Sequence, residues 1–139
     1  MEPEFIDYQK QILANAKKLS SALMANDIDI VSNGTANHMF LVNLVKNNLT
    51  GKVLDAALGD AHITVNKNSV PNDPQSPFVT SGIRIGTPAV TRRGFKENEM
   101  NMIAKWITDI IHDVDNIKLI ENTKNEVRDL CLQFPVYSR

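Results

Sequence analysis

Apolar residues recur at helical spacing in four stretches of the chain. In residues 3–25 they follow steps of three and four, which place them on one helix face. A short helix is predicted after Thr50, a favourable N-cap residue, and the longest apolar stripe covers residues 100–114. The last stripe, residues 120–134, ends before Pro135 because a proline cannot continue a helix. The residues expected to face the core from these helices are Ile12, Ala16, Leu19, Leu23, Val53, Leu54, Ala57, Leu58, Met100, Ile103, Ala104, Ile107, Ile110, Ile111, Val114, Ile120, Thr123, Val127, Leu130 and Phe134.

Short strand-like segments lie between these helices, at residues 28–31, 39–45, 63–65 and 83–85. The second is apolar without strict alternation, which predicts a strand covered on both faces. Residues 66–82 contain three prolines and are predicted to form a loop, and a loop of this length in a compact domain is usually functional. The order of the elements predicts an α+β (α/β two-layer) fold, with a small sheet and helices on one side.

The composition restricts the class of protein. The chain has 139 residues, of which 42% are hydrophobic and 22% charged, as in one globular domain covering residues 1–139. No apolar run approaches the roughly 18 residues of a membrane span, and the acidic N-terminus resembles neither a signal nor a transit peptide. The single cysteine, Cys131, cannot form an internal disulfide, which suits a reducing compartment. We therefore expect a cytoplasmic protein with no membrane partner.

The formal net charge is −1, which argues against a general nucleic-acid binder. A basic segment nevertheless lies between acidic flanks. Nucleic-acid binding through three arginines in an acidic chain is a weak hypothesis, and a solvated turn is favoured over an anion site for the Arg92–Arg93 pair. The charges of residues 67–94 are Lys67, Arg84, Arg92 and Arg93 against Asp73, a net charge of +3.

Arg84 is the most informative single residue. It alternates with Ile83 and Ile85 in a strand-like segment, where an unpaired guanidinium would be costly to bury. Arginine is the side chain that holds a carboxylate in a bidentate manner. A buried structural salt bridge or a solvent-facing edge position is the alternative, and the pattern by itself favours that alternative because strand arginines are mostly structural.

The other reactive side chains indicate no site by themselves. His38, His62 and His112 lack the mutual spacing of metal ligands, so no metal site is predicted. Cys131 lies beside an apolar stripe without an evident base, which favours a core or boundary position. Trp106 lies off the main stripe of its helix and indicates either a second packing face within the domain, the favoured reading, or a contact surface.

Several motifs resemble the serine hydroxymethyltransferase (glycine hydroxymethyltransferase) family, and its bacterial members most. The most specific are residues 64–74 (TVNKNSVPNDP) and 76–89 (SPFVTSGIRIGTPA). Shorter matches are GT at residues 34–35, NH at 37–38, LTGK at 49–52, TRRGF at 91–95 and FPVY at 134–137. The resemblance runs over essentially the whole chain but covers only the C-terminal part of that enzyme, whose members are about three times longer.

The resemblance implies the C-terminal small domain of an enzyme with the fold of aspartate-aminotransferase-type (fold type I) pyridoxal phosphate enzymes. It implies a homodimeric transferase of one-carbon metabolism, which uses pyridoxal 5′-phosphate and tetrahydrofolate to interconvert serine and glycine. In this family Arg84 would bind the carboxylate of the amino-acid substrate. Asn68 would bind the pteridine of folate, and Ser76 and Phe78 would line the pocket near its aminobenzoate.

The same resemblance implies a missing partner. The lysine segment that binds pyridoxal phosphate is absent from this chain, so no catalytic lysine is predicted here and the chain alone is expected to be inactive, without stably bound cofactor. The helix at residues 3–25 would connect it to the large N-terminal domain that holds the cofactor. This chain differs from the residues usual in the family at Ala36, Asn33 and Asn43. These differences are expected to affect local hydrogen bonding. The alternative is a truncated, non-catalytic binding or interaction module derived from that domain.

Overall fold

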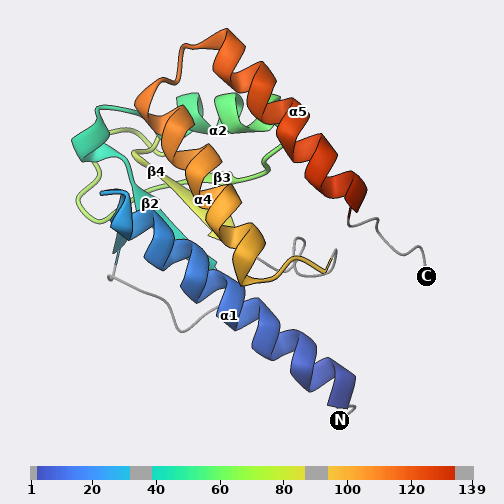
Figure 1. Cartoon of the computed structure of the whole chain (residues 1–139). Coiled ribbons are helices and arrows are strands. Elements are labelled where there is room, and N and C mark those ends of the chain that lie inside the picture. The colour runs from blue at the N-terminus through green and yellow to red at the C-terminus, as the bar shows by residue number, and fades with distance from the viewer. Residues whose placement is uncertain (1–2, 32–38, 87–93, 134–139) are drawn as a thin grey trace.

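The computed structural model describes residues 3–31, 39–86 and 94–133 (Figure 1). Helices and strands alternate along these segments, with a short 3-10 helix after β2. They are α1 (Pro3–Ala25), β1 (Asp29–Ile30), β2 (Met39–Asn43), η2 (Val45–Asn47), α2 (Gly51–Asp60), β3 (Asn66–Asn68), β4 (Gly82–Gly86), α4 (Glu97–His112) and α5 (Ile117–Gln133).

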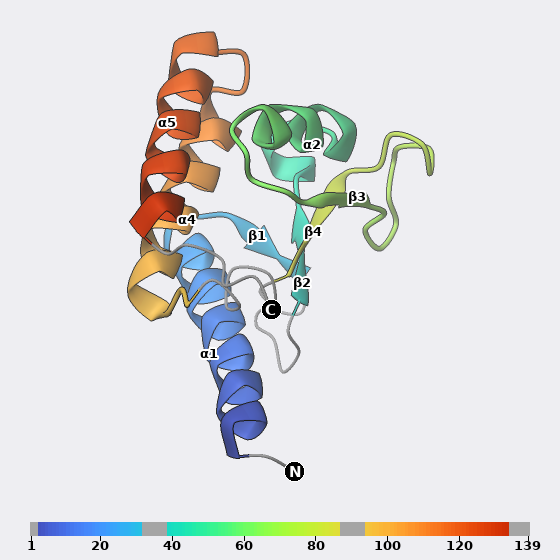
Figure 2. The same cartoon turned by 90° about the vertical axis from the view of Figure 1, so that its right-hand side faces the viewer.

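The strands form one antiparallel four-stranded sheet in the order β1-β2-β4-β3. Its inner face buries Phe40 and Val42 of β2 and Ile83 and Ile85 of β4. Helices α1, α4 and α5 lie on one side of the sheet (Figure 2). The predicted α+β fold, with helices on one side of a small sheet, is confirmed.

Helix α1 packs against α4 and the sheet along its predicted stripe. Leu19 and Leu23 are buried there, whereas Ile12, one turn or more toward the N-terminus, is only half-buried. The buried amide of Asn15 donates a hydrogen bond from Nδ2 to the carbonyl oxygen of Phe95 (2.9 Å), which fixes α1 to the segment that leads into α4. A fully buried amide requires such a partner.

Helix α2 begins where the sequence predicts. The Thr50 side chain accepts a hydrogen bond from the Val53 backbone N–H (3.2 Å), as an N-cap residue does. Leu54 and Leu58 are buried, but the prediction for Val53 is wrong, because its side chain is 45% exposed. Val53 lies one position before Leu54 and therefore points about a quarter-turn away from the buried face.

Two strand predictions need correction. Residues 63–65 form no strand, and the pairing with β4 occurs three residues later, at Asn66–Asn68. Val65 is buried as extended chain that leads into this strand, so its β-branched side chain marks the core and not the pairing. Strand β2 is fully covered on only one face, since half-buried and buried residues alternate along it, and a 3-10 helix begins at Val45.

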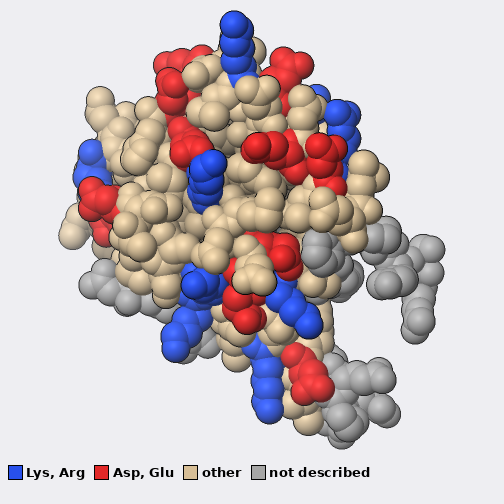
Figure 3. All heavy atoms as spheres, in the orientation of Figure 1, with Lys and Arg blue, Asp and Glu red and all other residues tan. Residues whose placement is uncertain are grey.

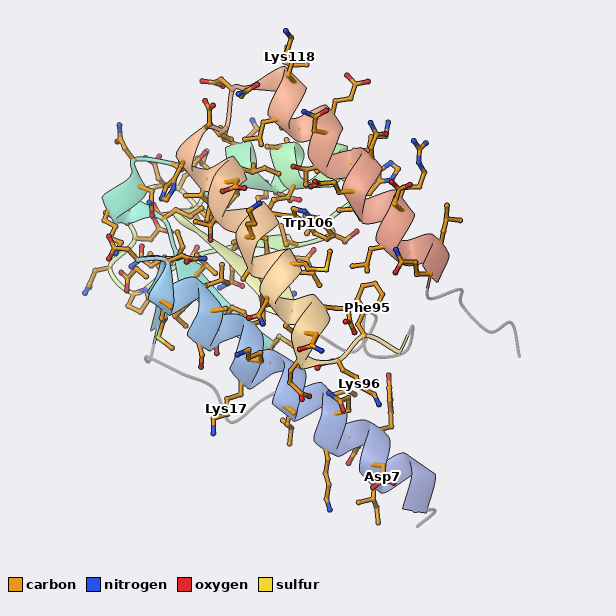
Figure 4. All side chains as sticks on the ribbon, viewed as in Figure 1. Asp7, Lys17, Phe95, Lys96, Trp106 and Lys118 are labelled. Atoms are coloured by element: carbon orange, nitrogen blue, oxygen red, sulfur yellow. The ribbon has the colours of Figure 1, made fainter. Side chains whose placement is uncertain are left out.

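Trp106 serves internal packing, the favoured of the two readings. It lies between α4 and α5 (Figure 4), is buried, and donates a hydrogen bond from Nε1 to Oε2 of Glu126 (2.8 Å). The indole therefore fills the interface while its polar edge reaches a partner near the surface. Cys131 on α5 is half-buried against the core, at the predicted boundary position.

Candidate functional site

Arg84 lies in the middle of β4, a central strand, on the face opposite the buried residues Ile83 and Ile85. Its register partners are Leu41 on β2 and Asn66 on β3. The side chain is exposed, and within the described parts of the chain no carboxylate lies at ion-pair distance from it. Among the described residues Arg84 therefore makes no salt bridge, and it faces solvent from a central strand and not from an edge strand, which leaves its guanidinium available to a planar anion.

Asn68 lies on the same outer face of the sheet as Arg84. Antiparallel register pairs Asn66 with Arg84 and Asn68 with Gly82, and residues two positions apart on a strand share a face. Asn68 and Arg84 are thus diagonal neighbours, a relation that places Cα atoms about 7–8 Å apart. The Asn68 amide donates from Nδ2 to the Ser69 carbonyl oxygen (2.9 Å).

Asn43 of β2 lies on this outer face as well, opposite Gly82. Its Oδ1 accepts a hydrogen bond from the Val45 backbone N–H (3.0 Å), and an amide oxygen serves this role as a carboxylate oxygen would. Although Asn43 differs from the residue usual in the family, its side chain still accepts this hydrogen bond. The other two departures, Asn33 and Ala36, lie outside the described residues.

The loop between β3 and β4 is organised around the Asp73 carboxylate. Its Oδ2 accepts from the backbone N–H groups of Val70 (3.2 Å) and Ser81 (2.8 Å). Its Oδ1 accepts from the backbone N–H of Gln75 (2.8 Å) and from the Ser81 hydroxyl (2.6 Å). Val70 follows β3 and Ser81 precedes β4, so one side chain joins the two ends of the loop.

These hydrogen bonds change the acidity of Asp73. Burial by the surrounding loop raises the pKa of its carboxyl group. The hydrogen bonds from Ser81, Gln75 and Val70 together have a larger, opposite effect and lower this pKa to about 2. All of these donors stabilise the ionised form. The loop therefore contains a carboxylate that stays charged well into the acid range.

Ser76 and Phe78 lie at the far part of this loop and not beside Arg84. The Ser76 carbonyl oxygen accepts from the backbone N–H groups of Val79 (3.0 Å) and Thr80 (2.9 Å), which forms a turn. The Phe78 side chain is 81% exposed, while its carbonyl oxygen accepts from Nζ of Lys67 (2.6 Å). The structure thus brings Arg84 and Asn68 together and presents Ser76 and Phe78 on a separate projection.

The N-terminus of α2 holds the outgoing end of the loop. The Gly51 N–H donates to the Thr80 carbonyl oxygen (3.0 Å), and the Lys52 N–H donates to that of Val79 (3.1 Å). A Cβ atom on Gly51 would come within 2.2 Å of Thr80 Oγ1 and 2.3 Å of the Gly82 carbonyl oxygen. Thr80 itself has φ of 59°, a left-handed conformation that costs a β-branched residue roughly 1–3 kcal/mol.

Sequence reasoning did not identify Asp73, Gly51 or Thr80 as parts of this site. A signal existed for Asp73, because an aspartate among prolines commonly accepts a hydrogen bond from the N–H two residues later, here that of Gln75. Gly51 and Thr80 carry no comparable local signal, since their importance comes from a contact between distant segments.

The remaining candidates that the structure describes add no reactive centre. In residues 3–31, 39–86 and 94–133, no three His, Cys, Asp or Glu side chains gather as a metal site requires. His62 and His112 are exposed, whereas His38, Arg92 and Arg93 lie outside the described residues. A cleft of about 400 Å³ between α4, α5 and residues 62–65 is lined mainly by apolar side chains, among them Phe95.

The surface and the helices give two further observations. On the face shown in Figure 3, Lys and Arg are interspersed with Asp and Glu without a continuous field of one sign. Nucleic-acid binding requires a continuous basic surface, and this face of the protein has no such surface. Among the described helices, none combines the length and hydropathy needed to cross a bilayer.

Comparison with known proteins finds relatives that match essentially the whole of this chain. The family model for serine hydroxymethyltransferase matches residues 1–107. The chain is 57% identical over 139 residues to the serine hydroxymethyltransferase of Dichelobacter nodosus and 58% identical over 137 residues to that of Nitrosococcus oceani. These alignments cover 100% and 99% of this chain but 33% of each relative, so the chain spans about a third of their length. Because the family model covers well over half of its residues, this chain belongs to the serine hydroxymethyltransferase family.

Proposed function

We propose that this chain supplies the amino-acid carboxylate site and part of the folate site of a cytoplasmic, pyridoxal phosphate-dependent serine hydroxymethyltransferase. The parent enzyme interconverts serine plus tetrahydrofolate with glycine plus 5,10-methylenetetrahydrofolate. The observation that carries this proposal is the position of Arg84 and Asn68 on one exposed face of the sheet.

The chemistry of the two side chains matches the two ligands. The planar fork of Arg84 can bind both oxygens of an amino-acid carboxylate. The amide of Asn68 offers a donor and an acceptor, which is what the edge of a pteridine ring needs. A one-carbon transfer requires both substrates to meet, and neighbouring positions on one sheet face satisfy that requirement.

The cofactor is held by another part of the parent in this proposal. Lys67, the lysine of β3, does not suit it, because its side chain leaves the strand on the face opposite Asn66 and Asn68. Its ammonium also donates to the Phe78 carbonyl oxygen. Pyridoxal phosphate supplies an electron sink for the amino-acid Cα when bound, and we assign it to the large N-terminal domain of a homodimeric parent.

The role of Arg84 is to orient the substrate. A carboxylate held at both oxygens fixes the rotation about the bond from the carboxylate to Cα. That rotation decides which bond of Cα is aligned for cleavage. Arg84 therefore contributes to turnover as well as to affinity.

The test uses a chimera in which this chain replaces the matching third of the Dichelobacter nodosus enzyme. Arg84→Lys keeps the charge but loses the planar fork. The contact is worth about 2–3 kcal/mol, so the affinity for serine should fall roughly 30–150-fold. Arg128→Lys is the matched control, since Arg128 is exposed on α5 and contacts Asn125. Serine affinity, turnover and melting temperature are measured for each.

Weakened serine binding in a chimera of normal stability and normal pyridoxal phosphate content supports the proposal. A lowered melting temperature with unchanged serine affinity contradicts it and returns Arg84 to a structural role. A chimera that is stable but inactive even with Arg84 intact would favour the alternative, a non-catalytic binding module derived from this domain.

A further inference from the structure

The loop between β3 and β4 has a closed base and an extended tip. Val70 lies next to the end of β3 and Ser81 next to the start of β4, and both donate backbone N–H groups to Oδ2 of Asp73. The other carboxylate oxygen takes the Ser81 hydroxyl and the N–H of Gln75, which starts the tip. The Asp73 carboxylate thus fixes the start of the tip to both ends of the loop, while α2 and Lys67 hold residues 78–80 on its outgoing side.

A carboxylate suits this position better than other side chains. It provides two oxygens that accept hydrogen bonds from several directions and donates none when ionised. Ser81 is buried, so its backbone N–H would otherwise lack a partner, and an unpaired buried donor is costly. Hydrogen bonds to an ionised acceptor are also stronger than neutral ones.

The tip carries Ser76 and Phe78, the two candidate folate-site residues that do not lie on the sheet face with Arg84 and Asn68. Phe78 is 81% exposed on it, and Ser76 forms its turn. Arg84, by contrast, is held within β4 between two paired strands and does not depend on the loop. A loosened loop base would displace the tip and leave Arg84 in place.

We propose that Asp73 is a positioning residue for tetrahydrofolate binding. Its carboxylate fixes the loop at residues 69–81 in the conformation that binds this substrate. The inference rests on the proposed function, because it takes the loop as part of the folate site. Asp73 itself touches no substrate in this scheme and acts through Ser76, Phe78 and the adjoining Asn68.

The experiment compares Asp73→Asn with Asp115→Asn in the chimera loaded with pyridoxal phosphate. The asparagine keeps the size of the side chain but places an NH₂ group against a backbone N–H or the Ser81 hydroxyl. Asp115→Asn removes the same charge at an exposed position between α4 and α5. Dissociation constants for tetrahydrofolate and for serine are measured by calorimetry, and backbone amide exchange is followed in the 139-residue chain.

Asp73→Asn should weaken tetrahydrofolate binding at least about 10-fold, because the loop must then be ordered on binding. Serine affinity should stay within about two-fold of the parent chimera, and amide exchange at Gln75 and Ser81 should accelerate. Asp115→Asn should change none of these. If Asp73→Asn does not fold, Ser81→Ala removes one of the four contacts and should act in the same direction more weakly.

Unchanged tetrahydrofolate affinity in Asp73→Asn would overturn the inference, as would equal weakening of serine and tetrahydrofolate, which indicates general destabilisation. Failure of the proposed function looks different, since Arg84→Lys would then leave serine affinity unchanged. Amide exchange in the 139-residue chain distinguishes the two failures, because it reports whether Asp73 holds the loop without reference to any ligand.

Discussion

The ionised form of Asp73 is the form that its surroundings select. Four hydrogen bonds converge on its two oxygens, three from backbone N–H groups and one from the Ser81 hydroxyl. A protonated carboxyl group would have to turn one oxygen from acceptor to donor and would oppose a backbone N–H. Protonation of this one group should therefore release the base of the loop.

We expect the contribution of ionised Asp73 to stability to be lost between about pH 4 and pH 2. The pKa of Asp73 is about 2 in the folded chain, below the value of about 3.9 for an unfolded aspartate. A lowered folded pKa contributes stability that is complete above the unfolded value and is lost as the pH falls through the folded value. Carboxyl ¹³C shifts measured by NMR should titrate with a midpoint near 2, and a midpoint at or above 3.9 would contradict this.

The sequence suffices for some residues of the site and not for others. Alternation of Ile83, Arg84 and Ile85 predicts that Arg84 faces away from its neighbours, and the structure confirms it. The role of Asp73 depends on Val70 and Ser81 meeting at the base of the loop, which no local pattern encodes. That no described carboxylate lies at ion-pair distance from Arg84 is likewise a property of the assembled sheet.

At the scale of elements, α2 and the loop are fitted to each other through one glycine. Gly51 starts the helix, is buried, and leaves no room for a side chain against Thr80 and the Gly82 carbonyl. Gly59, in the last turn of the same helix, is exposed and has no atom within 4 Å of an added Cβ. The two glycines of one helix therefore respond to the same substitution in opposite ways.

Gly51→Ala should destabilise the chain by about 1–3 kcal/mol, because α2 must move away from the sheet to admit the methyl group. Gly59→Ala should stabilise it by about 0.5–1 kcal/mol, the helix preference of alanine over glycine. Urea unfolding followed by circular dichroism gives both values as shifts of the midpoint. A midpoint for Gly51→Ala at or above that of the parent would show that the close approach is absent in solution.

Helices were predicted correctly where the apolar pattern extends over several turns. Strand prediction failed where pairing with a neighbouring strand determines which residues form the strand. The stripes of α4 and α5 are long enough to identify each helix, and Trp106 is explained once α5 is present as its partner. Strand β3 consists of Asn66, Lys67 and Asn68, which have low strand preference and pair because β4 lies alongside. The apolar residues 63–65 gave the stronger strand signal but serve the core.

At the scale of the whole molecule, the two faces of the sheet have different tasks. Helices α1, α4 and α5 cover one face of the sheet (Figure 2). By strand register, Arg84 and Asn68 lie on the other. The helical side supplies the apolar burial that stabilises the domain. The outer face is thereby free to carry polar side chains that ligands require.

The isolated chain should be catalytically inactive. In our proposal it supplies residues for the amino-acid carboxylate and for folate, whereas the cofactor is bound by the part of the parent that this chain does not span. The isolated chain mixed with pyridoxal phosphate, serine and tetrahydrofolate should show no turnover above a protein-free control. The chimera is the positive control. Turnover comparable to that of the chimera, or stoichiometric cofactor binding at one lysine, would contradict this expectation.

The short outer strands of the sheet affect how the protein behaves at high concentration. Strand β1 has two residues and strand β3 has three, with Lys67 at the centre of β3. An edge strand exposes unpaired N–H and C=O groups that can recruit a strand from another chain, and short, charged edges limit that recruitment. Longer, uncharged edges would be a template for intermolecular β-structure. The brevity of β1 and β3 thus protects the domain against aggregation by strand addition while its polar face stays accessible.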